Sequence, residues 1–282
     1  MRSLQGVRAV VTGAASGIGR ALALELAGRG VDLALTDLDV ARLEPVAEAV
    51  RALGRRVTVH GFDVADAAAW AAFRDEALAA HGSVQLLVNN AGVSLTGPFL
   101  SCSLEDLEWQ VGVNLWGVVH GCRASLPHLR TRPDAHLVNV SSLFGIVTVP
   151  DSAAYCMSKH AVRSLTEALE MELHGERVKI SSVHPGAVAT AIVTGGRFRA
   201  GGLMSEKQAR KLIAKGIPPE AAALRILTGI LRDERRILVG ADAVALAFLH
   251  QLAPVGYRRL VRWWMGRRGH GRAEQRTVDA AG

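Results

Sequence analysis

Short β-branched runs alternate with longer segments of helical periodicity along most of the chain. Strand-like runs lie at 7–12, 31–36, 57–62, 86–90, 136–141, 178–183 and 236–239. Helical patterns lie between them, at 17–29, 40–53, 66–81, 103–125, 153–174 and 218–232. Because the strands are apolar on both faces, the alternation predicts an α/β fold with a doubly wound parallel sheet. In such a sheet, ligands bind in the crevice beyond the carboxyl ends of the strands.

The chain beyond residue 240 follows a different pattern. Apolar residues recur there at helical spacing, at Tyr257, Leu260, Val261, Trp264 and Met265, with Arg258, Arg259 and Arg262 elsewhere on the same helix. We therefore expect one α/β domain over residues 1–240 and a helical, arginine-rich extension over 241–282. The stripe fits a helix that lies on an anionic membrane surface, or one that packs on this subunit or its partner.

Charge and cysteine content narrow the class of protein. The net charge is +7 over 282 residues, and seven arginines against two acidic residues from Arg258 onward carry most of the excess. Since no basic stripe interleaved with aromatics is present elsewhere, we expect no nucleic-acid binding. Cys102, Cys122 and Cys156 have no metal-binding spacing, so we expect reduced thiols, no metal site and a cytoplasmic protein.

A glycine-rich turn follows the first strand, with the sequence Thr12-Gly-Ala-Ala-Ser-Gly-Ile-Gly19. Glycines at a strand-to-helix turn let the backbone approach a pyrophosphate, and the helix N-terminus attracts the anion. The turn predicts nucleotide binding, although its G-x-x-x-G-x-G spacing is wider than the usual fingerprint. The candidate contacts are Gly13, Ser16, Gly17, Ile18 and Gly19.

The second strand ends in Asp37, followed by Leu38. A carboxylate at this position can hold the adenosine ribose hydroxyls and would repel a 2′-phosphate. Neither Leu38 nor Ser16 offers a cation for that phosphate, so NAD is favoured over NADP. The alternative is that Asp37 is a solvated residue that caps the next helix, a role that Asp39 could also fill.

Tyr155 and Lys159 are four residues apart, so on a helix they lie one turn apart on the same face. An ammonium beside a phenol favours the phenolate, so we expect a lowered tyrosine pKa and a role in proton transfer. Ser142 follows the strand at 136–141 and is placed to orient a substrate oxygen, with Ser141 as the alternative. Without partners, the Tyr-Lys pair could equally belong to an ordinary surface helix.

Four motifs in order closely resemble the short-chain dehydrogenase/reductase family. They are the turn at 12–19, Asn-Asn-Ala-Gly at 89–92, Ser142 with Tyr-x-x-x-Lys at 155–159, and Pro185-Gly186 with Thr190. The resemblance covers residues 4 to 240. It implies a Rossmann-type, seven-stranded domain, hydride transfer with a nicotinamide cofactor, and a homodimer or homotetramer.

The resemblance also implies roles for individual residues. Tyr155 would be the general acid/base, and Lys159 would bind the nicotinamide ribose. Ser142 would bind the substrate oxygen, and Asn114 would hold the water of a proton relay. Further cofactor contacts would be Asp63, Val64, Asn90, Ala91, Gly92, Pro185, Gly186, Val188 and Thr190.

Substrate preference is expected to depend on the segment after Thr190, where paired glycines bracket residues 197–199. Its composition suits a mobile lid or an ordinary flexible loop. Together with Leu95 and Phe144, the mostly apolar surroundings favour a hydrophobic secondary alcohol or ketone, such as a steroid, retinoid, terpenoid or fatty chain. The alternatives are an NADPH-linked 3-ketoacyl reductase and a nucleotide-sensing module without turnover.

Overall fold

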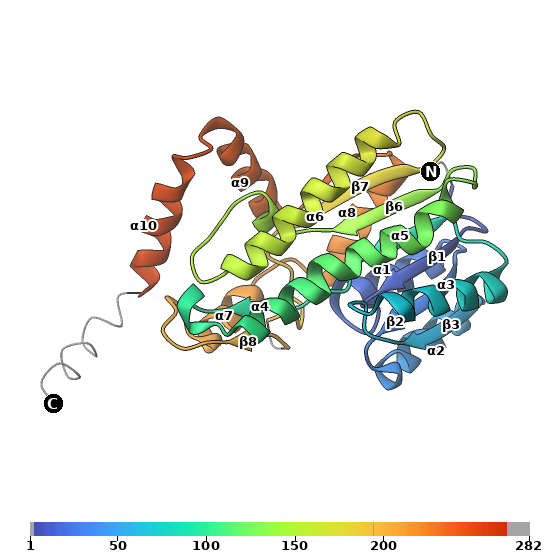
Figure 1. Cartoon of the computed structure of the whole chain (residues 1–282), viewed down its shortest axis with the longest axis horizontal. Coiled ribbons are helices and arrows are strands. Elements are labelled where there is room, and N and C mark those ends of the chain that lie inside the picture. The colour runs from blue at the N-terminus through green and yellow to red at the C-terminus, as the bar shows by residue number, and fades with distance from the viewer. Residues whose placement is uncertain (1–2, 194, 270–282) are drawn as a thin grey trace, which may run out of the picture.

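A seven-stranded parallel sheet forms the centre of the molecule (Figure 1). The computed structural model describes residues 3–193 and 195–269, with side chains as far as Trp263. The strand order is β3-β2-β1-β4-β6-β7-β9. These strands are β1 (Arg8–Thr12), β2 (Asp32–Asp37), β3 (Val57–Gly61), β4 (Leu86–Asn89), β6 (His136–Val140), β7 (Lys179–Pro185) and β9 (Arg236–Val239). The predicted doubly wound sheet of seven strands is therefore confirmed.

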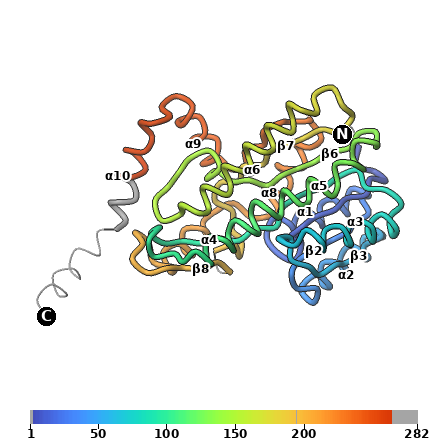
Figure 2. The backbone as a smooth tube through the Cα atoms, viewed as in Figure 1, coloured from blue at the N-terminus to red at the C-terminus, as the bar shows by residue number. Residues whose placement is uncertain are grey.

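Helices cover both faces of this sheet, and each layer buries its own apolar core. On one face lie α1 (Gly17–Gly28), α2 (Glu44–Ala52) and α8 (Pro219–Leu231). On the other lie α3 (Ala67–His81), α5 (Gly117–Leu129) and α6 (Ala153–Glu172). The strand order reverses between β1 and β4, so a crevice is expected where their carboxyl ends diverge. The backbone trace in Figure 2 follows this winding.

The helix expected over 103–125 is divided into three parts. Helix α4 (Leu104–Val111) leads into a π-helical segment, η3 (Gly112–Trp116), which continues as α5. Asn114 lies in the middle of the π segment and is fully buried. Such segments are frequent at functional sites because the extra residue per turn re-aims side chains.

The segment after Thr190 is ordered by a strand pair and by ion pairs. Its β8 (Arg197–Phe198) pairs in parallel with β5 (Leu95–Thr96), and α7 (Glu206–Ile213) follows. Asp106 of α4, only 1% exposed, accepts from Arg197 Nη1 at 3.1 Å and Arg199 Nε at 2.6 Å. The Arg197 guanidinium lies 4.1 Å from the Trp109 ring centroid. A buried carboxylate therefore anchors residues 197–199, so an ordinary flexible loop is the wrong expectation there, while closure of this segment over a substrate stays a prediction.

As far as residue 269, where the described part of the chain ends, the C-terminal extension contains two helices, α9 (Ala241–Leu252) and α10 (Tyr257–Gly269). In Figure 1 they extend past the sheet beside the connection from β6 to α6. Tyr257 is 3% exposed and packs with residues that follow β6, whereas Leu260 and Trp263 are about half exposed. The side chains of Trp264 and Met265, also assigned to the stripe, lie outside the described residues. Among the helices in the described ranges, none has the length and apolar character needed to span a membrane.

Candidate active site

The glycine-rich turn lies against the segment that follows β4, where the strand order reverses. Gly13 has φ 64°, and a Cβ there would lie 2.8 Å from Ala91 Cα. A Cβ at Gly19 would lie 2.1 Å from the Gly13 carbonyl oxygen. Only glycine permits these approaches, so the two loops of the crevice are in direct contact.

The N-terminus of α1 offers a fitting site for an anion. Ser16 is its N-cap, yet the serine side chain makes no capping hydrogen bond, and the first turn holds no acidic residue. Backbone N–H groups at a helix N-terminus favour a phosphate. Together with the close glycine contacts, Ser16, Gly17 and Ile18 therefore fit the pyrophosphate of a dinucleotide.

Asp37 ends β2 and faces the same turn. Its Oδ2 accepts the Ala15 N–H at 3.0 Å, and its Oδ1 accepts the Leu38 N–H at 2.9 Å. Asp39, by contrast, caps the following 3-10 turn by accepting the Ala41 N–H at 2.9 Å. The capping role therefore belongs to Asp39, and Asp37 remains beside the turn. Leu38 is 74% exposed at the rim.

Polar contacts fix the remaining residues predicted on the adenosine side. The Asn90 and Ala91 N–H groups both donate to Thr12 Oγ1 at 2.9 Å, which ties β4 to β1. Asp63 Oδ1 accepts the Ala65 N–H at 2.9 Å, and Val64 is almost fully buried. Beyond β4, a Cβ on Gly92 would lie 3.5 Å from the ammonium of Lys159. The adenosine-side and reaction-side residues thus line one continuous edge of the sheet.

Ser142, Tyr155 and Lys159 come together between β6 and α6. The Lys159 ammonium donates to the Val140 carbonyl at 3.0 Å and lies 5.9 Å from the Tyr155 ring centroid. Ser142 hydrogen-bonds Tyr155, whereas Ser141 turns away and donates to the Lys159 carbonyl at 2.8 Å. The structure therefore places Ser142, and not Ser141, beside the tyrosine.

Burial dominates the protonation of this group. It raises the pKa of Tyr155 to about 12, with the Ser142 hydrogen bond acting in the opposite direction. It lowers the pKa of Lys159 to about 8. Desolvation disfavours the charged form of each side chain. The expected lowering of the tyrosine pKa is therefore wrong for this structure, and Tyr155 is a protonated donor at neutral pH.

Asn114 uses its side chain to hold the loop after β4. Its Oδ1 accepts the Val93 N–H at 2.8 Å, and its Nδ2 donates to the Val93 carbonyl at 3.0 Å. The same amide donates to Ser158 Oγ at 3.3 Å, next to Lys159. Asn114 thus connects this loop to α6, while its part in a proton relay stays a prediction.

The loop after β7 reaches the glycine-rich turn at the carboxyl edge of the sheet. A Cβ on Gly17 would lie 3.0 Å from Thr190 Cγ2, so this loop reaches back to the glycine-rich turn. Pro185 ends β7, and the Ala187 N–H donates to Asp242 Oδ2 at 2.7 Å. Val188 is buried and bridged to Ile217. The predicted Pro185–Thr190 contacts are therefore brought to the site.

His184 directly precedes Pro185-Gly186, a position at which the sequence favours packing against the backbone. Its Nδ1–H donates to the Ser142 carbonyl at 2.9 Å, and its Nε2 lies 2.6 Å from Ser182 Oγ. Burial lowers the pKa of His184 to about 4, so the ring is neutral and positions Ser142. A histidine before Pro-Gly carries no spacing signal, because its partner is 42 residues away.

Phe144 and Leu95, the two predicted apolar substrate contacts, differ in placement. The Phe144 ring meets Tyr155 edge-on, with centroids 6.1 Å apart. Leu95 is 2% exposed within β5, which makes it a packing residue under the β5–β8 pair. Of the two, only Phe144 is placed to touch a molecule beside Tyr155.

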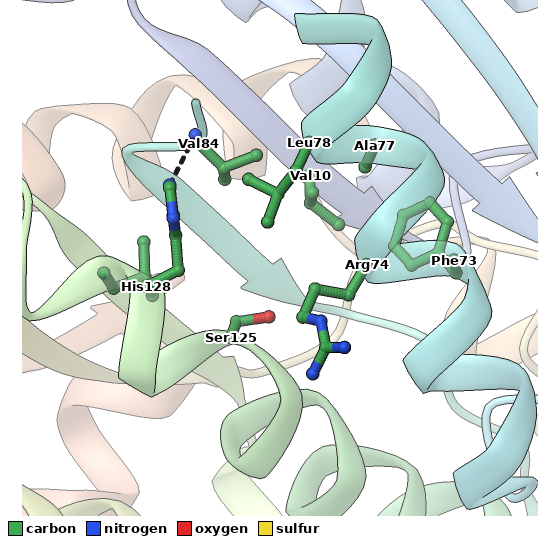
Figure 3. Close-up of a pocket in the computed structure, with 9 residues that line it drawn as sticks. Val10, Phe73, Arg74, Ala77, Leu78, Val84, Ser125 and His128 are labelled. Atoms are coloured by element: carbon green, nitrogen blue, oxygen red, sulfur yellow. Dashed lines mark hydrogen bonds between the residues drawn. The ribbon is translucent and has the colours of Figure 1, made fainter. Parts of the chain in front are cut away.

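A small cavity elsewhere lies between α3 and α5 (Figure 3). Its walls include Phe73, Leu78 and Leu129, and His128 Nε2 accepts the Val84 N–H at 3.1 Å. Its volume of about 20 Å³ suits roughly one water molecule. Because Val84 precedes β4, the cavity is at the amino ends of the strands and does not belong to the candidate site.

Comparison with known proteins agrees with this geometry. The sequence profile of the family described as short chain dehydrogenase matches residues 8–197. The chain is 40% identical over 266 residues to the oxidoreductase SadH of Mycobacterium tuberculosis, covering 93% of this chain and 96% of SadH. A short chain dehydrogenase/reductase from Burkholderia phymatum, solved in complex with NAD, is 33% identical with a TM-score of 0.86, covering 92% and 97%. A metagenomic short-chain oxidoreductase in complex with NADP is 32% identical with a TM-score of 0.69, covering 83% and 97%.

Proposed function

The chain belongs to the short-chain dehydrogenase family of oxidoreductases, and on this basis we propose that it transfers a hydride between NAD and a hydrophobic secondary alcohol or ketone. The observation that carries the proposal is the grouping of Ser142, Tyr155 and Lys159 at the carboxyl end of β6, on the same edge of the sheet as a glycine-rich turn whose helix N-terminus suits a dinucleotide phosphate. A nicotinamide cofactor supplies the hydride chemistry when bound.

In the direction of reduction, the proton comes from the protein. Ser142 holds the substrate oxygen and Tyr155, protonated at neutral pH, donates to it. The Lys159 ammonium, fixed by Val140, stabilises the phenolate that this donation leaves. Oxidation runs the same steps in reverse, with Tyr155 taking the proton from the alcohol oxygen, and because it releases a proton overall it is favoured as pH rises.

The preference for NAD rests on Asp37. Relatives of known structure bind either NAD or NADP, so they do not decide the cofactor. Asp37 lies beside the glycine turn, and its neighbour Leu38 provides no cation for a 2′-phosphate. We expect Asp37→Ala to shift the kcat/KM ratio toward NADPH, with Asp39→Ala as the matched control. A wild-type enzyme that prefers NADPH would show the cofactor assignment wrong.

The apolar substrate class is supported by Phe144 beside Tyr155. A screen of steroid, retinoid, terpenoid and fatty alcohols and ketones, read as NADH absorbance, tests it. Preferential turnover of small hydrophilic alcohols would contradict the class. Turnover confined to acyl thioesters with NADPH would instead favour a 3-ketoacyl reductase, and NAD binding without any turnover would favour a sensor.

Two further properties complete the proposal. Several large apolar side chains are exposed on α4 and the neighbouring segments, among them Leu100 at 94% and Leu104 at 76%, which supports a homodimer or homotetramer. Light scattering tests this, and a monomer at micromolar concentration would contradict it. We place the protein in the cytoplasm.

We also propose that the C-terminal extension contacts the membrane surface peripherally. The support is an apolar stripe on α9, formed by Val244, Phe248 and Leu252, each more than half exposed, near the exposed arginines 258, 259 and 262. Flotation with anionic and neutral vesicles tests it. Association with anionic vesicles that is unchanged after deletion of residues 255–282 would exclude α10 as the contact, and a full-length chain that does not float with anionic vesicles would contradict membrane contact.

A further inference from the structure

We infer that the C-terminal extension positions the two loops on either side of the reaction centre, through Asp242 on the cofactor side and Tyr257 on the substrate side. The inference rests on the proposed function for its catalytic meaning. Its structural basis is that these two residues contact the segments that follow Pro185 and Ser142, each of which belongs to one of the predicted motifs.

Asp242 is a positioning residue for the loop after β7. Its Oδ2 accepts the Ala187 N–H at 2.7 Å, and a Cβ on Gly186 would lie 2.2 Å from its Oδ1. Gly240, at φ 99°, makes the turn that begins α9 and brings the carboxylate to this place. The loop then runs to Thr190, which contacts Gly17. Asp242 therefore holds the start of the loop that carries the predicted cofactor contacts at 185–190.

Tyr257 is a positioning residue for the loop after β6. Its hydroxyl oxygen accepts the Thr148 N–H at 2.9 Å, across 109 residues of sequence. Its ring packs with Leu143, Ile146 and Val147 in a small separate core, and His250 lies edge-on at 5.1 Å. This loop carries Phe144, whose ring faces Tyr155. Tyr257 therefore fixes the apolar wall of the substrate site.

The two contacts predict separate kinetic signatures. Asp242→Ala removes the carboxylate that accepts a charge-assisted hydrogen bond from the 185–190 loop. We therefore expect this variant to raise the dissociation constant of NAD about tenfold or more. Asp242→Asn keeps an acceptor oxygen and should restore most of the affinity. Tyr257→Phe keeps the packed ring but loses the acceptor, and it should raise the KM for the alcohol severalfold while NAD binding is unchanged.

The experiment uses the full-length chain and matched controls on the same helices. Val244→Ala on α9 and Leu260→Ala on α10 remove about half-exposed apolar side chains and should behave as wild type. Calorimetric titration measures NAD affinity, and initial rates give KM and kcat for the best alcohol of the screen. The inference is supported if Asp242→Ala changes only the dissociation constant of NAD and Tyr257→Phe changes only the KM for the alcohol.

Two results would overturn it. The first is a dissociation constant for NAD and a KM for the alcohol that equal those of the wild type in both variants. The second is that each variant weakens NAD and alcohol binding equally, in proportion to the fall in its melting temperature, as a purely structural role would give. If the wild type turns over no alcohol or ketone, the proposed function fails separately. Hydrogen exchange then tests the positioning alone: it should rise at 185–190 in Asp242→Ala and at 143–148 in Tyr257→Phe, and unchanged exchange would refute it.

Discussion

Replacing Lys159 by methionine should abolish turnover and also stabilise the protein. The ammonium is 2% exposed, and burial lowers its pKa from an ordinary 10.5 to about 8. That difference corresponds to a penalty of about 3 kcal/mol for holding the charged form in the folded state. Methionine removes the penalty but leaves the Val140 carbonyl without its donor, which costs about 1 kcal/mol. We expect a net gain of about 2 kcal/mol at pH 7.

The sign of the pH dependence provides a second check. Between pH 8 and 10.5, the unfolded lysine stays protonated while the folded one does not, so wild-type stability rises with pH in this range. The advantage of the variant should therefore shrink by about 2 kcal/mol between pH 7 and pH 9.5. Urea unfolding without added nucleotide, at both pH values, measures it.

The control is Lys179→Met, at an exposed lysine that begins β7. It should show no comparable gain and no such pH dependence. A Lys159→Met variant that is less stable than wild type at pH 7, or a difference that does not change with pH, would refute the reasoning that the site holds a desolvated ammonium at the expense of stability.

Two further predictions concern the anchors of the site. Gly19→Ala should weaken NAD binding by more than tenfold, since its Cβ would lie 2.1 Å from a backbone oxygen. The control is Gly28→Ala in the same helix, whose Cβ meets nothing within 4 Å. Equal NAD affinities of the two variants would contradict the geometry of the glycine-rich turn. Asp106→Asn should lower the stability of the protein at pH 7. The arginines hold the pKa of Asp106 well below its ordinary value, so its contribution is present above an unfolded pKa of about 3.9 and lost as pH falls. The difference in urea midpoint should therefore narrow between pH 6 and pH 3, and a constant difference would show that the charge is not the cause.

Much of the architecture was predictable because the central strands are apolar on both faces. The seven expected strands agree with those of the sheet within one or two residues, since burial in this sheet and strand propensity favour the same segments. The helix expected at 103–125 was harder, because its π segment contains Asn114, which bonds to Val93 21 residues away, and no local pattern encodes that contact. The two-residue strands β5 and β8 depend on Asp106, a contact that no local pattern encodes.

The residues of the candidate site were largely predictable, but their environment was not. Tyr155 and Lys159 share a helix face, as their spacing indicates, and Ser142 lies beside them. The spacing places the ammonium near the phenol but does not show that both side chains are buried. Desolvation therefore raises the pKa of Tyr155, where the sequence predicts a lowered one. Asp242 was missed because its partner Ala187 is 55 residues away.

The boundary expected at residue 240 does not coincide with a break in the packing. The two helices beyond it contribute Ala243 and Tyr257 to a core shared with Leu143, Ile146 and Val147. The expected boundary therefore separates two sequence patterns, while the packing across it is continuous.

The central claim is that Tyr155 supplies the proton for hydride transfer. Tyr155→Phe keeps the ring against Phe144 and removes only the hydroxyl that meets Ser142. With the alcohol or ketone chosen by the screen, we expect kcat to fall by about 10²- to 10⁴-fold. The dissociation constant of NAD, measured by calorimetry, should stay within about twofold of wild type. Turnover at the wild-type rate in a variant that binds NAD normally would contradict the account.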